Sequence, residues 1–354
     1  MAYTTIDNPE LFFQNKTYTG DGGTTQALTL DGSKNMQPDL VWVKMRSEGQ
    51  SNILVDSVRG ANKYLGSNHT GAEGTDINSV TAFGSDGFTV GNDNAVNKSS
   101  GTYVAWNWKA GTSFTNDASS TGIGTIDSTG SASSDAGFSI VSYTGNGTSG
   151  ATVKHGLSTA LDVIFIKNRD ESEAWQTYHR PLGATHHLVL NGTDSAQDND
   201  SRFNDVHPTS SVFTLGNNDT VNKNTVKFIA YCFHDVKGYS KFGSYTGNGS
   251  SNGSYIHLGF SPSFYMIKRT DTTGAWIIKD NLRPGFNVNG SYLVANDNQA
   301  EATGSGNVAS DELSNGFKIR GTSSALNTSG GTYIYMAFAE NPFVTSTGIP
   351  TTAR

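Results

Sequence analysis

A short motif that recurs three times constrains the fold of this chain more than any other feature. The motif reads TYTGDG at residues 17–22 and SYTGNG at both 142–147 and 244–249. When the copies are aligned on this motif, a lysine in a short apolar run falls in one column: Lys44, Lys167 and Lys268. A fixed order of matching blocks is the sequence signature of tandem units.

Later blocks coincide in the same alignment. Eight residues after the second and third lysines stand Trp175 and Trp276, where the first copy has Asn52. Each copy then closes with a strongly apolar run: YVAWNW, FIAYCF and YIYMAF. Because the blocks share both order and spacing, composition alone does not explain them, and we infer three homologous units.

The repeats divide the chain into domains. The predicted repeat domains are residues 14–110, 137–238 and 239–343. Each has about 100 residues, enough to bury its own core. Residues 1–13 form a lead-in, and 344–354 an extended polar tail. Residues 111–136 are rich in Ser, Thr and Gly, which predicts a linker of low intrinsic structure with a short strand near 123–126.

Composition favours β-structure in every unit. The chain has 41 glycines and 8 prolines, and Ser, Thr, Asn and Asp separate short apolar runs. Gly and Asn supply the positive φ angles of tight turns. In the second copy the predicted strands are FSIVSYT, TVKHG, VIFIKN, AWQTYH, HLVLN, SVFTLG and KFIAYCF. Turn signals at this cadence are typical of a sandwich or barrel.

The strands are of two kinds, which favours two facing sheets. GFSIVSYT alternates between apolar and polar residues, as a half-covered strand does. VIFIK and FIAYCF are apolar on both faces, as expected of strands buried between layers. We therefore predict an all-β fold of three tandem antiparallel β-sandwich repeats, jelly-roll or concanavalin-like, each around its own apolar interior.

Charge and composition exclude several classes of protein. The net charge is −7 and basic residues are not clustered, so nucleic-acid binding is not expected. No apolar run approaches the length of a membrane span. The N-terminus lacks a basic start and an apolar core, so no signal peptide is predicted. Cys232 is the single cysteine, so an intrachain disulfide is excluded and a buried thiol is expected.

No metal, cofactor or catalytic residue is predicted. His186 and His187 lie in one predicted strand and point to opposite faces. Turns rich in Asp and Asn offer oxygen ligands for calcium, although Asx-turns account for them equally well. They lie at residues 91–94, 194–200 and 216–219. Neither a nucleophile elbow nor a carboxylate pair beside aromatic residues is apparent.

Two interpretations are open for the SYTGNG motif, and two for a set of three aromatic residues. SYTGNG fits a strand that passes into a turn; a phosphate-binding loop would need a following helix, and none is predicted. Trp175, Trp276 and Tyr178 are candidate ligand-binding residues, since exposed aromatic rings stack on sugars. Packing inside the sheets explains the two tryptophans at least as well, because they are equivalent between copies.

The sequence also resembles a known group of proteins. Several blocks are similar to repeat proteins of marine tailed bacteriophages, which include virion structural proteins described as tail-fibre or concanavalin-like. These blocks are GFSIVSYTGNG, SSVFTLGN, FIAYCF, KGYSKFGSYTGNG, LSNGFKIRG, GTYIYMAFAENPF and the terminal TGIPTTAR. The resemblance covers nearly the whole chain and carries over no active site. The first copy departs from it, with Asn52 in place of tryptophan and YVAWNW in place of FIAYCF.

The resemblance implies a non-enzymatic structural protein on the exterior of a phage particle. The expected function is tail-fibre-type adhesion to a host surface glycan or protein, with other virion proteins as partners and a homotrimer as the assembly. The protein would be made in the host cytoplasm, without nucleic-acid binding or membrane insertion. The alternatives are a capsid decoration or head-fibre protein and, less favoured, a glycan depolymerase.

Overall fold

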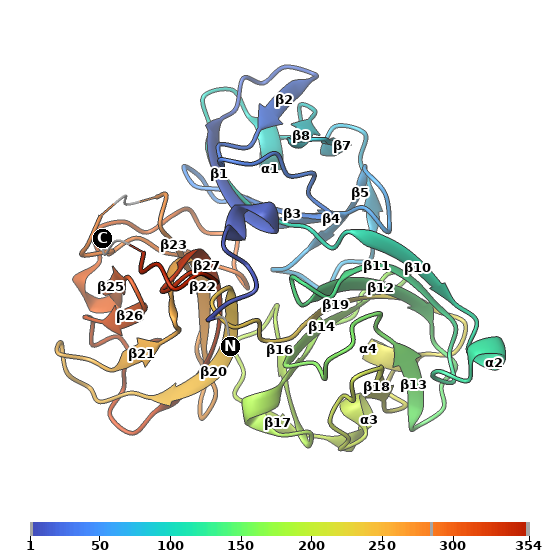
Figure 1. The fold of residues 1–354 in the computed structure, drawn as a ribbon. Coiled ribbons are helices and arrows are strands. Elements are labelled where there is room, and N and C mark those ends of the chain that lie inside the picture. The colour runs from blue at the N-terminus through green and yellow to red at the C-terminus, as the bar shows by residue number, and fades with distance from the viewer. Residues whose placement is uncertain (1–2, 284–285, 352–354) are drawn as a thin grey trace.

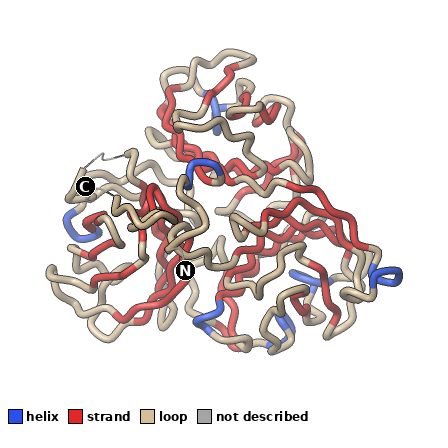
Figure 2. The backbone as a smooth tube through the Cα atoms, in the orientation of Figure 1, coloured by secondary structure: helices blue, strands red, loops and turns tan. Residues whose placement is uncertain are grey.

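The computed structural model describes residues 3–283 and 286–351, which form three β-sandwich modules around a common centre (Figure 1). Each module has a large and a small sheet, and every ladder between named strands is antiparallel. Strands dominate the part of each module that faces the centre, and the helices are short (Figure 2). The all-β prediction of three tandem sandwich repeats is confirmed.

Module 1 contains nine strands. Its large sheet has the order β1 (Phe13–Thr19), β9 (Thr102–Trp108), β3 (Leu40–Met45), β4 (Ile53–Asp56), β5 (Lys63–Gly66) and β6 (Gly74–Thr75). Its small sheet has the order β2 (Gln26–Thr29), β8 (Gly87–Val90) and β7 (Val80–Gly84). Two short helices accompany them, η1 (Pro9–Leu11) and α1 (Asn94–Asn97).

Module 2 repeats this plan with two added strands. Its large sheet runs β10 (Thr112–Asn116), β11 (Ser128–Ser133), β12 (Phe138–Thr144), β19 (Lys227–Phe233), β14 (Val163–Asn168), β15 (Gln176–His179), β16 (His186–Val189) and β17 (Gln197–Asp198). The small sheet pairs β13 (Ala151–Lys154) with β18 (Val212–Leu215). The helices are α2 (Ala118–Thr121), η2 (Arg180–Leu182), α3 (Asp200–Phe203) and α4 (Asp219–Asn222).

Module 3 has the same core plan. Its large sheet runs β20 (Ser240–Thr246), β27 (Thr332–Pro342), β22 (Phe260–Arg269), β23 (Trp276–Asp280) and β24 (Leu293–Val294). The small sheet runs β21 (Tyr255–His257), β26 (Gly316–Ile319) and β25 (Ser310–Leu313), with η3 (Gly306–Val308) nearby.

The segment predicted as a linker is an ordered part of the module 2 sheet. β11 pairs with β12 along its length and β10 pairs with β11. Asp117 caps the short helix between them, and Gly122 ends that helix in the left-handed region. The linker prediction is therefore wrong: edge strands need little apolar content, so a Ser/Thr-rich composition does not exclude them. Ile126, where a short strand was expected, makes only an isolated bridge to Val153.

Both terminal segments pack on module 3. The Tyr3 hydroxyl donates to the Gly259 carbonyl over 2.9 Å, and the Ser346 backbone N–H donates to Asp7 over 2.6 Å. The tail was predicted to be extended, but it folds back: the Thr345 N–H donates to the Ile349 carbonyl over 2.9 Å. The prediction missed the turn that Gly348 allows at its positive φ.

The described residues form four apolar cores. Each module has one between its own two sheets. The fourth lies where the outer faces of the three large sheets meet. It includes Trp42, Trp106 and Trp108 of module 1, Phe165, Trp175 and Phe233 of module 2, and Met266, Trp276 and Phe338 of module 3.

This shared core corrects the prediction that each unit folds only around its own interior. Runs such as VIFIK are apolar on both faces because one face packs on the module's small sheet and the other on a neighbouring module. Burying one large apolar side chain contributes roughly 1.5–3 kcal/mol, so the shared core binds the modules into a single body. No helix among the described residues is long and apolar enough to cross a membrane.

Candidate functional site

The recurring motif holds a turn inside each module. The hydroxyl groups of Tyr18, Tyr143 and Tyr245 each donate over 2.7 Å to a carbonyl of the turn or helix before the last strand. A Cβ on Gly145 would lie 2.3 Å from the Lys223 carbonyl oxygen, so the backbone can approach only a glycine here. The prediction of a strand passing into a turn is confirmed, and the motif serves packing.

The three aligned lysines connect the modules into a closed ring. All three side chains are buried, and each amine donates to a backbone carbonyl of a neighbouring module. Lys167 of module 2 reaches Thr70 of module 1, Lys268 of module 3 reaches Thr193 of module 2, and Lys44 of module 1 reaches Asn298 of module 3, over 2.9, 3.2 and 3.0 Å. Burial lowers the pKa of each lysine to about 8.

The predicted ligand-binding tryptophans belong to the same ring. The Trp175 Nε1–H donates to the Gly66 carbonyl over 2.8 Å, and the Trp276 Nε1–H donates to the Val189 carbonyl over 3.0 Å. Asn52 takes this place in module 1 and donates to the Asp297 carbonyl of module 3 over 2.9 Å. The amide of Asn52 is therefore part of the ring contact.

None of the three aromatic candidates offers a ring face to a ligand. Trp175 and Tyr178 have no exposed surface and Trp276 is 3% exposed. The Tyr178 hydroxyl makes a 2.7 Å hydrogen bond with Nδ1 of His207. The stacking interpretation is corrected: these rings fill cores, because the apolar faces of the sheets are covered on both sides.

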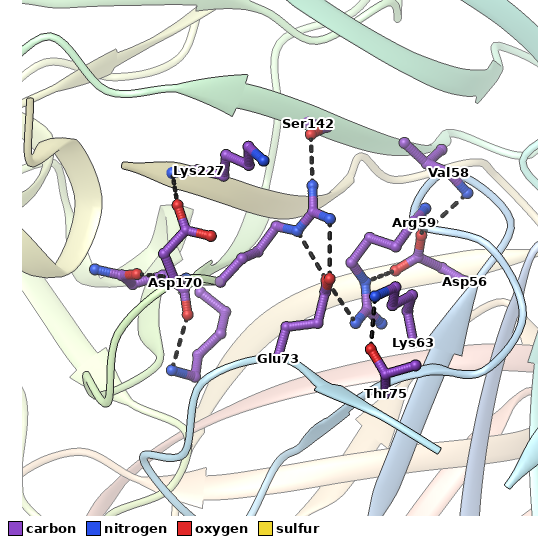
Figure 3. A network of polar contacts seen from close by, with 12 residues as sticks. Asp56, Val58, Arg59, Lys63, Glu73, Thr75, Ser142, Asp170 and Lys227 are labelled. Carbon is purple, nitrogen blue, oxygen red and sulfur yellow. Dashed lines mark hydrogen bonds and ion pairs between the residues drawn. The ribbon is translucent and has the colours of Figure 1, made fainter. Parts of the chain in front are cut away.

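Charged side chains reinforce the contact between modules 1 and 2, as Figure 3 shows. Arg169 of module 2 donates to both Glu73 carboxylate oxygens over 2.8 and 3.1 Å and to the Ser142 hydroxyl over 3.2 Å. Asp56 pairs with Arg59 in a fully buried ion pair and accepts from the Tyr231 hydroxyl of module 2 over 2.8 Å.

An open cleft lies beside this network, and we consider it a candidate binding site. Its volume is about 780 Å³. One wall is the hairpin of β10 and β11 with the helix between them, which the other modules lack. The lining residues that carry polar groups include Thr115, Asp117, Asp127, Thr129, Ser142, Thr144, Arg169 and Lys227.

Local hydrogen bonds fix the acidic groups of this cleft. Asp117 accepts from Ser119 and Ser120, and these hydrogen bonds lower the pKa of its carboxyl. Asp127 accepts from the Ala118 N–H over 2.8 Å. The Lys227 side chain is exposed, whereas Tyr143, the aromatic residue of the lining, is 3% exposed. The cleft therefore presents hydrogen-bonding and charged groups rather than exposed aromatic rings.

The Asp- and Asn-rich turns act as helix caps. The side chains of Asp93, Asn199 and Asn218 accept from backbone N–H groups at the starts of α1, α3 and α4. Within residues 3–283 and 286–351, no group of three or more His, Cys, Asp or Glu side chains is placed to hold a metal ion. His186 and His187 lie on β16, Cys232 is buried, and burial raises the pKa of its thiol.

Sequence reasoning missed the cleft and the ion pairs. The cleft depends on the hairpin that composition predicted as a linker. Arg46 and Arg169 stand two residues after the aligned lysines, so a column of basic residues was visible, but their acidic partners lie on other modules.

These contacts define a class of protein: a closed ring of three homologous β-sandwich modules within one chain. The chain belongs to the family described as Domain of unknown function (DUF7483), which matches residues 8–342. No curated protein and no solved structure matches it.

Proposed function

We propose that this protein is a non-enzymatic virion structural protein of tail-fibre type that adheres to a host surface glycan or protein. The resemblance to marine phage repeat proteins supports the setting on the particle exterior. The observation that carries the adhesive role is the polar cleft, which an insertion builds on a rigid ring. Binding residues on loops and insertions held by a rigid scaffold are a common arrangement.

The chemistry of the cleft suits a saccharide. Hydroxyl groups of Thr115, Thr129, Ser142 and Thr144 stand beside charged Asp117, Asp127, Arg169 and Lys227, and such a surface exchanges many hydrogen bonds with a polyhydroxylated ligand. Each site would be weak because no exposed aromatic ring is among its lining residues. Several copies on one particle would raise the overall affinity through effective concentration.

The proposed homotrimer would assemble through other surfaces. The outer faces of the three large sheets are already used inside one chain. The ring itself assigns no surface to contacts between chains or to other virion proteins. We propose these partners from the resemblance alone.

A charge reversal in the cleft tests the adhesive proposal. We expect Lys227→Glu to weaken binding of the purified chain to host envelope polysaccharide by about tenfold, measured by surface plasmon resonance. Lys34→Glu is the matched control, because it makes the same charge change at an exposed site on module 1. Equal binding by both variants and the unaltered chain would contradict the cleft as the binding site.

The depolymerase alternative has one observation in its favour, since two carboxylates line the cleft. Hydrogen bonds lower the pKa of Asp117, whereas a general acid needs a raised pKa. We therefore expect the purified chain to leave host polysaccharide at full length, as measured by size-exclusion chromatography. Shortening that Asp117→Asn abolishes would establish the enzyme instead.

A further inference from the structure

A buried polar cluster distinguishes the interior of module 3 from that of module 1. Tyr265, Lys279 and Glu312 lie within it, with exposures of 0%, 0% and 3%. By strand register the equivalent positions in module 1 are apolar: Val41, Val55 and Phe83. Charged groups inside a core are costly unless they are paired or have a function. The presence of polar residues in module 3 where module 1 has apolar ones therefore requires a reason.

The cluster meets a loop that is specific to module 3. Residues 281–292 between β23 and β24 form a longer connection than 57–62 of module 1 or 180–185 of module 2. From this loop Asn289 enters the cluster with no exposed surface. The Asn287 carboxamide borders it: its Nδ2 donates to the Glu312 backbone carbonyl over 2.7 Å, and its Oδ1 accepts from the Glu312 backbone N–H over 2.9 Å.

One side chain and two backbone groups contact the Asn289 carboxamide, and the Lys279 amine contacts the backbone carbonyl of the same residue. The Lys279 amine donates to the backbone carbonyl of Asn289 over 2.7 Å. The Asn289 Nδ2 donates to Glu312 Oε1 over 2.8 Å and to the Asp280 carbonyl over 3.3 Å. The Asn289 Oδ1 accepts from the Ser291 N–H over 3.0 Å.

Glu312 is itself held in place. The Tyr265 hydroxyl donates to Glu312 Oε1 over 2.7 Å and shares a 2.6 Å hydrogen bond with Ser310. A carboxyl group thus contacts the nitrogen of the carboxamide, while a backbone N–H contacts its oxygen. The Lys279 amine lies at the backbone carbonyl of the same residue.

Burial favours the neutral forms of the two ionisable groups. It lowers the pKa of Lys279 to about 7 and raises the pKa of Glu312. A desolvated lysine amine is a nucleophile, and a protonated carboxyl is a general acid. Burial thus shifts both groups toward the forms that acyl transfer requires.

We propose that Lys279 and Asn289 form an intramolecular isopeptide bond, with Glu312 as the acid–base group. Lys279 Nζ attacks Asn289 Cγ, the Nζ–Cγ bond forms, and the Cγ–Nδ2 bond breaks. Glu312 gives its proton to the departing Nδ2 and takes one from Nζ, so it ends as it began. One ammonia leaves, and the step needs neither an oxidant nor a further reactant.

Each contact has a role in this step. The Ser291 N–H stabilises the charge that develops on Oδ1. Tyr265 and Ser310 position Glu312 at the leaving nitrogen. The product ties the loop covalently to β23, which would make module 3 resistant to local opening on an exposed particle surface.

Mass spectrometry of the purified full chain tests the proposal. We expect an intact mass lower by one ammonia than the sequence requires, and a branched chymotryptic peptide that joins Lys279 to Asn289. The variants Lys279→Arg and Glu312→Gln should each keep the ammonia. Lys167→Arg, which alters a buried lysine outside the cluster, should lose it as the unaltered chain does.

Two results would overturn the proposal. One is the full sequence mass in the folded, unaltered chain after prolonged incubation. The other is an ammonia loss that persists in Lys279→Arg, because a succinimide at Asn289–Gly290 produces it without the lysine. If a variant fails to fold, the branched peptide of the unaltered chain still decides, since its presence supports the bond and its absence contradicts it.

Discussion

Ion pairs reinforce the contacts between modules 1 and 2 and between modules 3 and 1, whereas the described residues form no ion pair between modules 2 and 3. One backbone hydrogen bond recurs at all three contacts. The N–H groups of Glu73, Ala196 and Glu301 donate to the carbonyls of Arg169, Thr270 and Arg46, over 2.8, 2.9 and 2.8 Å. Two of these positions carry an arginine and a glutamate that pair, and the third carries threonine and alanine.

The same difference appears deeper in the ring. Asp56 with Arg59 and Asp280 with Arg283 are buried ion pairs that accept a hydrogen bond from Tyr231 and Trp106 of the neighbouring module. At the contact between modules 2 and 3 the equivalent position is His179, whose Nε2 lies 3.1 Å from the Tyr335 carbonyl oxygen.

Chain connectivity gives a reason for the ion pairs between modules 3 and 1. Modules 1 and 2 and modules 2 and 3 follow one another directly, since β10 begins shortly after β9 ends and β20 shortly after β19 ends. A short tether gives a high effective concentration, which the contact between modules 3 and 1 lacks. Modules 3 and 1 meet through residues far apart in the sequence, for example Lys44 and Asn298, which are 254 positions apart. There, buried charges penalise any wrong pairing, since an unpaired buried charge is costly.

The largest effect is expected from breaking the ring closure. Asp280→Ala removes the nearer of the two buried carboxylates that pair with Arg283, the other being Glu301, and leaves Trp106 Nε1 without its acceptor. We expect the free energy of unfolding to fall by about 3–5 kcal/mol, measured by urea denaturation.

The matched comparison is a pair at the surface. Asp271→Ala removes an ion pair with Arg269 in which Asp271 is partly exposed, and such pairs contribute at most about 1 kcal/mol. Equal losses for both variants would show that the charged closure has no special energetic role.

The stability of the contact between modules 2 and 3 should fall in acid. Burial lowers the pKa of His179 to about 4, so the unfolded chain binds a proton at higher pH than the folded chain does. The contribution of His179 to the free energy of unfolding is therefore fully present above pH 6.5 and is lost as the pH drops through 6.5 toward 4. His155 and His187 contribute in the same direction.

A variant isolates the share of His179. His179→Gln removes the titrating group, and we expect a shallower decline of the unfolding free energy between pH 6.5 and 4, by roughly 1.4 kcal/mol for each unit of pKa shift removed. Urea denaturation at several pH values measures it. An unchanged slope would assign the acid sensitivity to other groups.

The sequence predicted the units better than it predicted their assembly. The strands of module 2 follow from local alternation and turn residues, so FSIVSYT and KFIAYCF match β12 and β19. Trp175, Lys167 and Asn52 were visible as aligned columns, but their partners lie on other modules, and no local pattern encodes that contact.

The cleft escaped prediction for a different reason. A Ser/Thr-rich stretch becomes an ordered hairpin only because the edge of the module 2 sheet is available for pairing. The buried cluster around Lys279 was equally hidden, since Glu312 and Asn289 are brought to it by tertiary structure alone.

The smallest effect on stability is expected from adding an ion pair at the contact between modules 2 and 3. Thr270→Arg with Ala196→Glu reproduces the pair found at the other two contacts. We expect the double variant to change stability by less than about 1 kcal/mol, and Ala196→Glu alone to destabilise because its carboxylate lacks a partner. A double-mutant cycle by urea denaturation measures the coupling, for which contacting residues give about 0.5–3 kcal/mol. Zero coupling would mean that backbone register alone does not place the pair, so the charged contacts depend on the deeper ion pairs beside them.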